Sequence, residues 1–376
     1  MNGLTVCALA LGVLALAPAA ASAASGETRE HIPMDGIEGW TAELYAGCPA
    51  AKSFVPGPKL EGAAAGIMAF DSRGTAYVAC ETFIEVITPD GRAAVLTGVP
   101  DVAGSTDGPP GEATFGNAID IALANDDLLY VVDGANLTLR KIERKDGVWT
   151  TSTVAGKSGA NGHADGSGAE VRFTTPFESL VVDEKGVVYL LDGDWLRKFE
   201  NGKVATLNAG SGYRNGPLGQ ALFQRSQGRQ HGMTCDGQGN LYIADKLNMA
   251  IRKVDLKKGE VTTVAGTLPG VPKDRPRDGP ALEARFHPGG GPNMIFYDGT
   301  RDCLIARSDD ESVIRIIEDG WMKTFGPMPA GKNPPLVGPW KNVSGGVPCG
   351  LDGAGNVYVM GSNCIRVVRQ AKGGAR

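Results

Sequence analysis

The chain repeats one segment six times, and this repetition constrains its fold more than any other feature. The copies lie 53, 59, 53, 62 and 54 residues apart, and their central residues are Tyr77, Tyr130, Tyr189, Tyr242, Leu304 and Tyr358. The clearest copy, residues 235–245, predicts a strand, an Asp-Gly turn and a second strand, and residues 251–254 and 261–266 predict two more. Each repeat therefore predicts four short antiparallel strands.

Six such units predict an all-β fold, a six-bladed β-propeller of four-stranded antiparallel blades. The composition agrees, because 54 glycines among 376 residues supply many tight turns. The sixth copy ends after its third strand, residues 364–368, whereas residues 42–47 resemble a fourth strand that has no blade of its own. We expect one propeller over residues 40–370, closed by this N-terminal strand, and a tail at 371–376.

The chain begins with a predicted signal peptide. Residues 1–23 are apolar and end in Ala-Ser-Ala before a polar segment, so we expect a secreted or periplasmic protein. No later apolar run approaches the roughly 20 residues of a membrane span. The net charge of −5, without a run of five like charges, argues against nucleic acid as a partner.

Removal of residues 1–23 leaves six cysteines, an even number that permits disulfides in an oxidising compartment. Antiparallel pairing of the closing strand would bring Cys48 near Cys364, which makes this pair a candidate ring-closing disulfide. Six cysteines allow 15 pairings, so the others stay open.

The repeat resembles the NHL repeat, over nearly all of the chain after the signal peptide and most clearly in the fourth unit. Recurring residues belong to this scaffold: a Tyr on most second strands, and a third-strand arginine at Arg140, Arg197, Arg252, Arg315 and Arg366. A residue that every blade needs is not special to one site, so we interpret these as packing and blade-stapling groups. A phenylalanine after each inter-blade turn is expected to tuck under its loop: Phe115, Phe173, Phe223 and Phe286.

One position breaks the repeat. The second strand ends in an acid in three consecutive blades, Asp133, Asp192 and Asp245, and in Cys80, Arg307 and Gly361 in the other three. These positions belong to the face that carries the loops after second strands, where propellers usually hold ligands. Two interpretations stay open: a ligand face confined to half of the ring, or drift at poorly specified loop positions.

A second constellation lies where each innermost strand begins, at the expected mouth of the central channel. Alignment of the repeats places there Gly66, Ile119, Glu178, His231, Asn293 and Val347. Glu178, His231 and Asn293 come from neighbouring blades, and Asp120 lies one residue beyond Ile119. Together with His163 and His287, His231 is also a candidate zinc set.

Resemblance to two propeller enzyme families sharpens the metal hypothesis. The stretch from His231 to Asp236 resembles the His-Gly-Leu-x-x-Asp wording of the amidating lyases, which hold zinc in their channel. Gluconolactonase-like propellers bind calcium through Glu, Asn and Asp, and Glu178, Asn293 and Asp120 resemble that set in residue type. These resemblances imply zinc or calcium, although no cofactor is assured by the sequence.

We therefore expect an exported NHL-type propeller that acts as a binding scaffold for a protein, peptide or glycan on its loop-rich face. The ligand-binding candidates are Glu178, His231, Asn293, Asp120 and Arg307. The alternative is a metal-dependent lyase or lactonase at the channel mouth. The enzyme would lose activity when His231 or Glu178 becomes Ala, whereas a scaffold would tolerate both changes and depend on the loops around blades five, six and one.

Overall fold

In four of the repeats an Asp side chain closes the first hairpin of the blade. Asp236 accepts hydrogen bonds from the backbone N–H groups of Gln238 and Asn240, which fixes the turn between the first two strands of blade four. The same side-chain turn recurs at Asp71, Asp183 and Asp352. The Asp that opens the repeated segment is therefore a turn former, which explains its recurrence.

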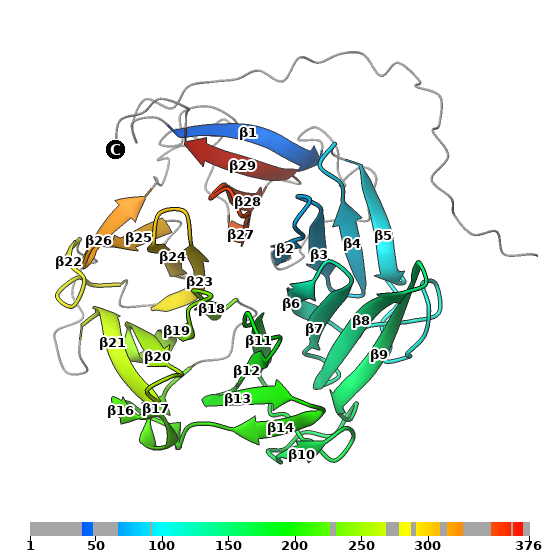
Figure 1. Ribbon diagram of the computed structural model, residues 1–376, viewed down its shortest axis with the longest axis horizontal. Helices are drawn as coiled ribbons and strands as arrows, with labels where there is room; N and C mark the ends of the chain where they lie inside the picture. Colours follow the sequence, from blue (N-terminus) through cyan, green and yellow to red (C-terminus); the bar gives the residue numbers. More distant parts are fainter. Residues whose placement is uncertain are drawn as a thin grey trace, which may run out of the picture. The chain divides into compact units, whose positions relative to one another are not determined.

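The computed structural model describes residues 40–47, 67–90, 92–225, 231–267, 278–286, 291–308, 314–325, 347–361 and 364–370. They belong to one compact unit, His31–Arg376. This unit is almost entirely β-structure, and six antiparallel sheets form a six-bladed β-propeller (Figure 1). The predicted fold class is confirmed.

The blades follow one another along the chain. Blade one consists of β2 (Met68–Phe70), β3 (Ala76–Cys80), β4 (Phe83–Ile87) and β5 (Ala93–Gly98). Blade two consists of β6 (Ala118–Asn125), β7 (Leu128–Asp133), β8 (Thr138–Lys145) and β9 (Val148–Gly156). Blade three consists of β11 (Phe177–Val182), β12 (Val188–Asp192), β13 (Trp195–Glu200) and β14 (Lys203–Thr206). Blade four consists of β18 (Met233–Cys235), β19 (Asn240–Asp245), β20 (Ala250–Asp255) and β21 (Glu260–Gly266). Blade five consists of β23 (Pro292–Asp298), β24 (Cys303–Ser308), β25 (Ile314–Glu318) and β26 (Trp321–Phe325). Blade six consists of β27 (Val347–Leu351), β28 (Val357–Gly361), β29 (Cys364–Gln370) and β1 (Trp40–Gly47).

The N-terminal strand closes the ring, as predicted. β1 pairs antiparallel with β29 from Trp40 opposite Gln370 to Gly47 opposite Cys364, and it is the outer strand of blade six (Figure 1). Closure removes the free sheet edge that a ring of separate blades would leave. Cys48 lies outside the described residues, so the Cys48–Cys364 disulfide stays a prediction. Of the cysteines described with their side chains, Cys80, Cys235 and Cys303 are free.

The connections between blades add short outer strands. β10 (Gly166–Ser167), β16 (Gly216–Pro217) and β22 (Gly279–Pro280) pair with β14, β21 and β26. The connection that contains β16 also contains β15 (Gly210–Ser211) and β17 (Leu222–Phe223), which pair parallel, and the 3₁₀ turn Leu218–Gln220. A second 3₁₀ turn, Lys246–Asn248, follows β19. Within the described chain, no helix has both the length and the apolar character that crossing a membrane requires.

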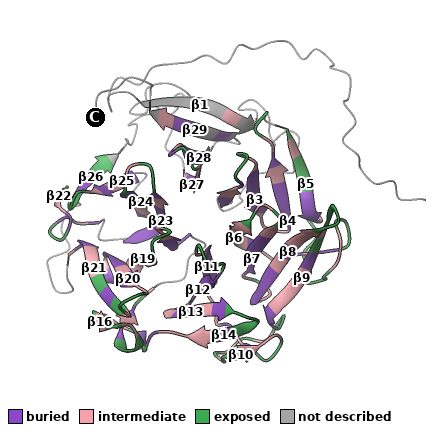
Figure 2. Ribbon diagram, in the orientation of Figure 1, coloured by how far each residue is buried: buried purple, intermediate pink, exposed green. Residues whose placement is uncertain are grey.

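The core lies between neighbouring blades. Buried side chains run along the strands of each blade, and exposed residues gather in the turns (Figure 2). Phe115, Phe173, Phe223 and Phe286 are all buried, as predicted. In blades two to four the repeat arginine lies over this phenylalanine ring, with its guanidinium carbon 4.9 to 5.3 Å from the ring centroid.

Candidate functional site

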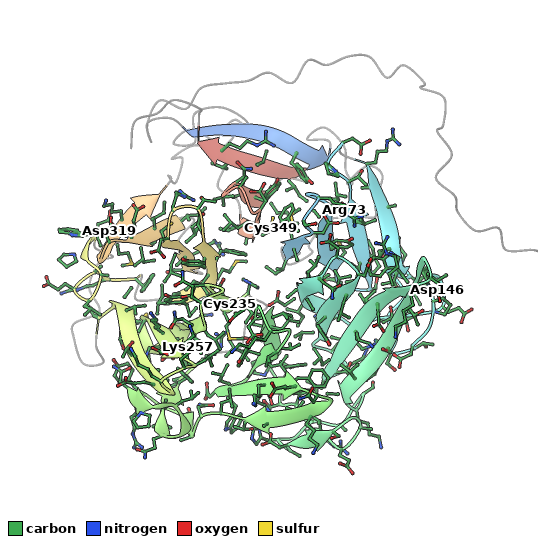
Figure 3. All side chains as sticks on the ribbon, in the orientation of Figure 1. Arg73, Asp146, Cys235, Lys257, Asp319 and Cys349 are labelled. Carbon is green, nitrogen blue, oxygen red and sulfur yellow. The ribbon has the colours of Figure 1, made fainter. Side chains whose placement is uncertain are left out.

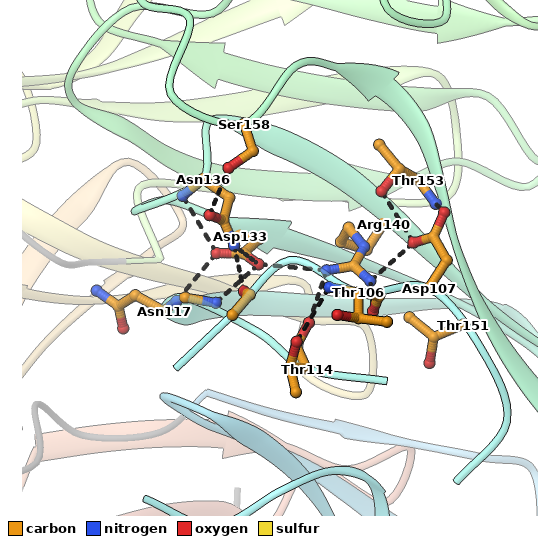
Figure 4. Close-up of polar contacts among 12 residues, drawn as sticks. Thr106, Asp107, Thr114, Asn117, Asp133, Asn136, Arg140, Thr151, Thr153 and Ser158 are labelled. Atoms are coloured by element: carbon orange, nitrogen blue, oxygen red, sulfur yellow. Dashed lines mark hydrogen bonds and ion pairs between the residues drawn. The ribbon is translucent and has the colours of Figure 1, made fainter. Parts of the chain in front are cut away.

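In blades two to four, the repeat arginine and the acid at the end of the second strand form a buried ion pair, which we call the staple. In blade two, Arg140 on β8 donates to the carboxylates of Asp133 and Asp107, and its side chain is fully buried (Figure 4). Asp133 also accepts the backbone N–H groups of Gly116 and Asn117, just before the inner strand. The staple therefore fastens the inter-blade loop to the blade that follows it.

Blades three and four repeat this arrangement. Arg197 donates to Asp192 and Asp165, and Arg252 donates to Asp245 and Asn215. Asp192 and Asp245 are fully buried. The acids that the sequence marked as a half-ring ligand face are thus anchors of inter-blade loops, neither exposed to a ligand nor products of drift.

The counterpart of these acids in blade five is Ser308, where the alignment of the sequence chose Arg307. Ser308 pairs with Pro292 at the start of β23, as Asp192 pairs with Phe177 at the start of β11. The centre of this repeat is correspondingly Ile305, one residue beyond Leu304. Arg307, on β24, lies opposite Met294 of β23 and is half-buried.

The inner-strand starts carry a shared irregularity. Near their starts, β6, β11 and β23 each have one extra residue relative to the next strand, and the residues there without a cross-strand partner are Ile119, Glu178 and Asn293. His231 holds the same place in blade four, because the next residue, Gly232, accepts the backbone N–H of Ala244. A β-bulge changes the direction of the side chain of its extra residue, so the side chain at this position points differently from those along the rest of the strand. Val347 is half-buried at the start of β27, and Gly66 lies outside the described residues.

Asp120 and His231 form a buried pair across the inner strands. His231 Nδ1 lies 3.0 Å from each carboxylate oxygen of Asp120. Asp120 is fully buried and also accepts the Ser179 hydroxyl and the backbone N–H of Leu180, at 2.9 and 3.0 Å. One carboxylate of blade two thereby joins blades three and four.

The His231 ring is held in place from a second side. It stacks on the Phe296 ring of β23, with the centroids 4.8 Å apart and the planes 19° from parallel. Its Nε2 makes no hydrogen bond to any residue that the structure describes. A histidine that is oriented through Nδ1 in this way presents Nε2 to a ligand, a proton or a metal ion.

Glu178 and Arg225 form the second buried charge pair of this region. Arg225 Nη2 lies 3.3 Å from Glu178 Oε2, and both side chains are only 5% exposed. The other guanidinium nitrogen, Nη1, donates to the carbonyls of Gly232 and Ala244. We call Asp120, Glu178, Ser179, Arg225 and His231 the inner cluster.

The remaining site candidates lie in different surroundings. Asn293 is buried on β23 at 2% exposure. His163 stacks on Trp195 of β13 at 4.2 Å, and its ring contacts Thr206 and Asp192 rather than the inner cluster. His287 lies outside the described residues, so the three-histidine zinc set stays a prediction. Among the residues that are described, no three His, Cys, Asp or Glu side chains are grouped to hold a metal ion.

Sequence reasoning missed Ser179, Arg225 and Phe296. Ser179 could have been found, because it follows Glu178 just as Asp120 follows Ile119 in the aligned repeats. Arg225 belongs to an irregular connection, and Phe296 reaches His231 from the next blade, so the repeat carried no signal for either.

No protein-family model and no curated protein sequence matches the chain. An auxiliary nutrient binding protein from Bacteroides thetaiotaomicron superposes with a TM-score of 0.60 at 13% identity, covering 88% of this chain and 76% of that one. Another from Bacteroides ovatus superposes with a TM-score of 0.55 at 12% identity, over the same shares. A gluconolactonase from Xanthomonas campestris gives 0.48 at 11% identity, over 90% of this chain and 97% of its own. At these identities the likeness shows the fold alone.

Proposed function

We propose that this protein is an exported NHL-type propeller that serves as a binding scaffold and holds a protein, peptide or glycan on its loop-rich face. The observation that supports this is that the buried carboxylates of the inner cluster contact other residues of the same chain. Asp120 binds Ser179, Leu180 and His231, and Glu178 binds Arg225, so the buried carboxylates tie together blades of the same chain. Two propellers of similar fold are nutrient binding proteins, which is compatible with a binding role.

The proposal predicts that ligand binding survives the loss of His231. We expect the purified protein to retain specific members of a glycan array or a peptide array, with saturable binding of those members in calorimetry. His231→Ala removes a contact of Asp120 and so lowers stability, but the dissociation constant should stay within about twofold because the loops make the interface. His163→Ala, which changes a histidine outside the inner cluster, is the matched control.

A tenfold or greater loss of affinity in His231→Ala, with His163→Ala unchanged, would place the ligand in the inner cluster and contradict a loop-face scaffold. Retention of no arrayed glycan or peptide would contradict it as well. Both variants are first compared by circular dichroism, so that a folding defect is recognised.

A second candidate is a metal-dependent lyase or lactonase, and the Asp120–His231 pair is the observation that favours it. A carboxylate on Nδ1 fixes the tautomer and makes Nε2 a better metal ligand. Asp120 would orient His231, while Glu178 and Asn293 would offer oxygen ligands to a hard cation such as calcium.

Metal analysis tests this candidate. If it is correct, protein purified without chelators or a His tag holds about one equivalent of zinc or calcium per chain, and His231→Ala or Glu178→Gln lowers that content to background. His163→Ala leaves the content unchanged if His231 binds through the inner cluster, and lowers it if the three-histidine set is correct. No metal above background after incubation with either ion excludes both enzymes.

A further inference from the structure

A cavity of about 630 Å³ lies between blades four and five. Its walls include Tyr242 of β19, Tyr297 near the end of β23, and Glu318 at the end of β25. Asn293 occupies the opposite end of β23 from Tyr297, so this cavity is separate from the inner cluster and from the loop-rich face. Asp319, on the hairpin tip between β25 and β26, also lines the cavity and lies at the rim of the ring (Figure 3).

The cavity combines aromatic and apolar walls. The rings of Tyr242 and Tyr297 are 6° from parallel with centroids 6.1 Å apart. Leu282, which also lines the cavity, is 59% exposed although it is a large apolar side chain. These surfaces suit the body of an apolar or aromatic ligand rather than a hydrated ion.

The charge around these walls is strongly negative. Among the described residues that line the cavity, Lys253 is the one cation, and four residues carry carboxylates: Glu283, Asp302, Glu318 and Asp319. None of the four forms an ion pair with another residue in the described part of the chain. Burial, and then the nearby carboxylates of Asp236 and Asp302, raise the pKa of Tyr242 to about 12, and of these two acids Asp302 lines the cavity.

Lys253 lies against the aromatic wall of the cavity. Lys253 Nζ lies 5.8 Å from the centroid of the Tyr242 ring. An ammonium group over a tyrosine face is a favourable contact, so the site already shows the kind of group that its walls accept.

The corresponding cavity between blades two and three has walls of a different charge. That cavity has about 370 Å³ and contains Tyr130, Lys141, Glu200 and Asn201 where the first contains Tyr242, Lys253, Glu318 and Asp319. Lys185 is a second cation there, and the charges are paired: Lys141 with Glu143, and Glu200 with Lys198. The cavity between blades two and three thus lacks the excess of unpaired carboxylates that lines the cavity between blades four and five.

We propose that the cavity between blades four and five binds an organic cation, a primary ammonium on an aliphatic chain, through the tyrosine walls and the unpaired carboxylates. Two sources share this chemistry: a free alkyl diamine, and the side chain of a lysine in a peptide. The inference does not depend on the proposed scaffold function, because it uses a different face and different residues.

Calorimetric titration at low salt tests it with 1,5-diaminopentane and with the blocked tripeptide acetyl-Ala-Lys-Ala-amide. We expect saturable one-to-one binding that weakens as salt is raised. The Glu318→Gln and Asp319→Asn double variant should bind about tenfold more weakly, since it removes two of the four carboxylates. Asp319 has a positive φ of 49°, which asparagine tolerates, so this variant is expected to fold. Tighter binding of the diamine identifies a free amine as the ligand type, and tighter binding of the tripeptide identifies a peptide.

Two further variants make the test specific. Glu200→Gln changes the equivalent residue of the other cavity and should leave affinity within about twofold. Lys253→Met removes the resident ammonium from the Tyr242 ring and should tighten binding by about threefold or more, a gain that a merely structural role would not produce. The proposal is overturned if neither amine binds saturably, if Glu200→Gln weakens binding as much as the double variant, or if acetyl-Ala-Glu-Ala-amide binds equally well.

Discussion

Replacement of Arg140 by methionine is expected to lower the free energy of unfolding by about 3–5 kcal/mol. Arg140 is fully buried and donates to the carboxylates of Asp133 and Asp107 and to the carbonyls of Thr106 and Thr114. Methionine fills much of the volume but leaves Asp133, which is also fully buried, without its cation. It also leaves the Thr114 carbonyl without a donor, whereas the Thr106 carbonyl keeps the backbone N–H of Thr114. Urea unfolding followed by circular dichroism measures the loss.

Arg144→Met is the matched control because it lies on the same strand, β8. Arg144 pairs with Asp127 at the surface, and both side chains are partly exposed, so the expected cost is at most about 1 kcal/mol. A double variant separates charge from packing: Asp133→Asn should cost less in the Arg140→Met background than alone, since it removes the unpaired buried charge. Equal costs for Arg140→Met and Arg144→Met would show that the staple contributes nothing to stability.

The blade architecture could be predicted because the same pattern of strands and turns occurs six times in the sequence. Strands, Asp turns, phenylalanines and arginines recur in the same order from repeat to repeat, and this recurrence reflects the local requirements of a blade. The closing strand was also predictable, because the sixth repeat lacked a fourth strand that residues 42–47 could supply. The register error, Arg307 in place of Ser308, arose because the hairpin of β23 and β24 has one more residue between its paired ends, Pro292 and Ser308, than the matching hairpin of blade three.

The inner cluster could be predicted only in part. Alignment placed Glu178, His231 and Asn293 at one level, since each starts an inner strand. It could not show that Asp120 reaches His231 past blade three, because the distance between non-adjacent blades depends on the radius and tilt of the whole ring. Nor could alignment assign a role to Asp133, Asp192 and Asp245, since a buried anchor and an exposed ligand group have the same residue type.

Blade one departs from the staple in a way that the sequence alignment overlooked. Glu85 lies opposite Val78 on β3, the place that Arg140 takes opposite Val131 in blade two. Its side chain is buried, at 5% exposure for the residue, and forms no hydrogen bond or ion pair with the residues that the structure describes. Burial alone raises the pKa of this carboxyl from 4.5 to about 7.

Glu85→Gln is therefore expected to stabilise the protein at pH 8 and to leave its stability nearly unchanged at pH 4.5. Between the ordinary pKa of 4.5 and the folded value of about 7, the folded state keeps a proton that the unfolded state has released, so the free energy of unfolding falls as pH rises. The cost is complete above pH 7 and is on the order of 3 kcal/mol, which glutamine avoids because it carries no charge. Urea unfolding at the two pH values measures it, with the exposed Glu112→Gln as control. If Glu85→Gln gave the same change in stability at both pH values, or destabilised the protein at pH 8, the folded state would have to stabilise the Glu85 carboxylate, and burial would not govern its pKa.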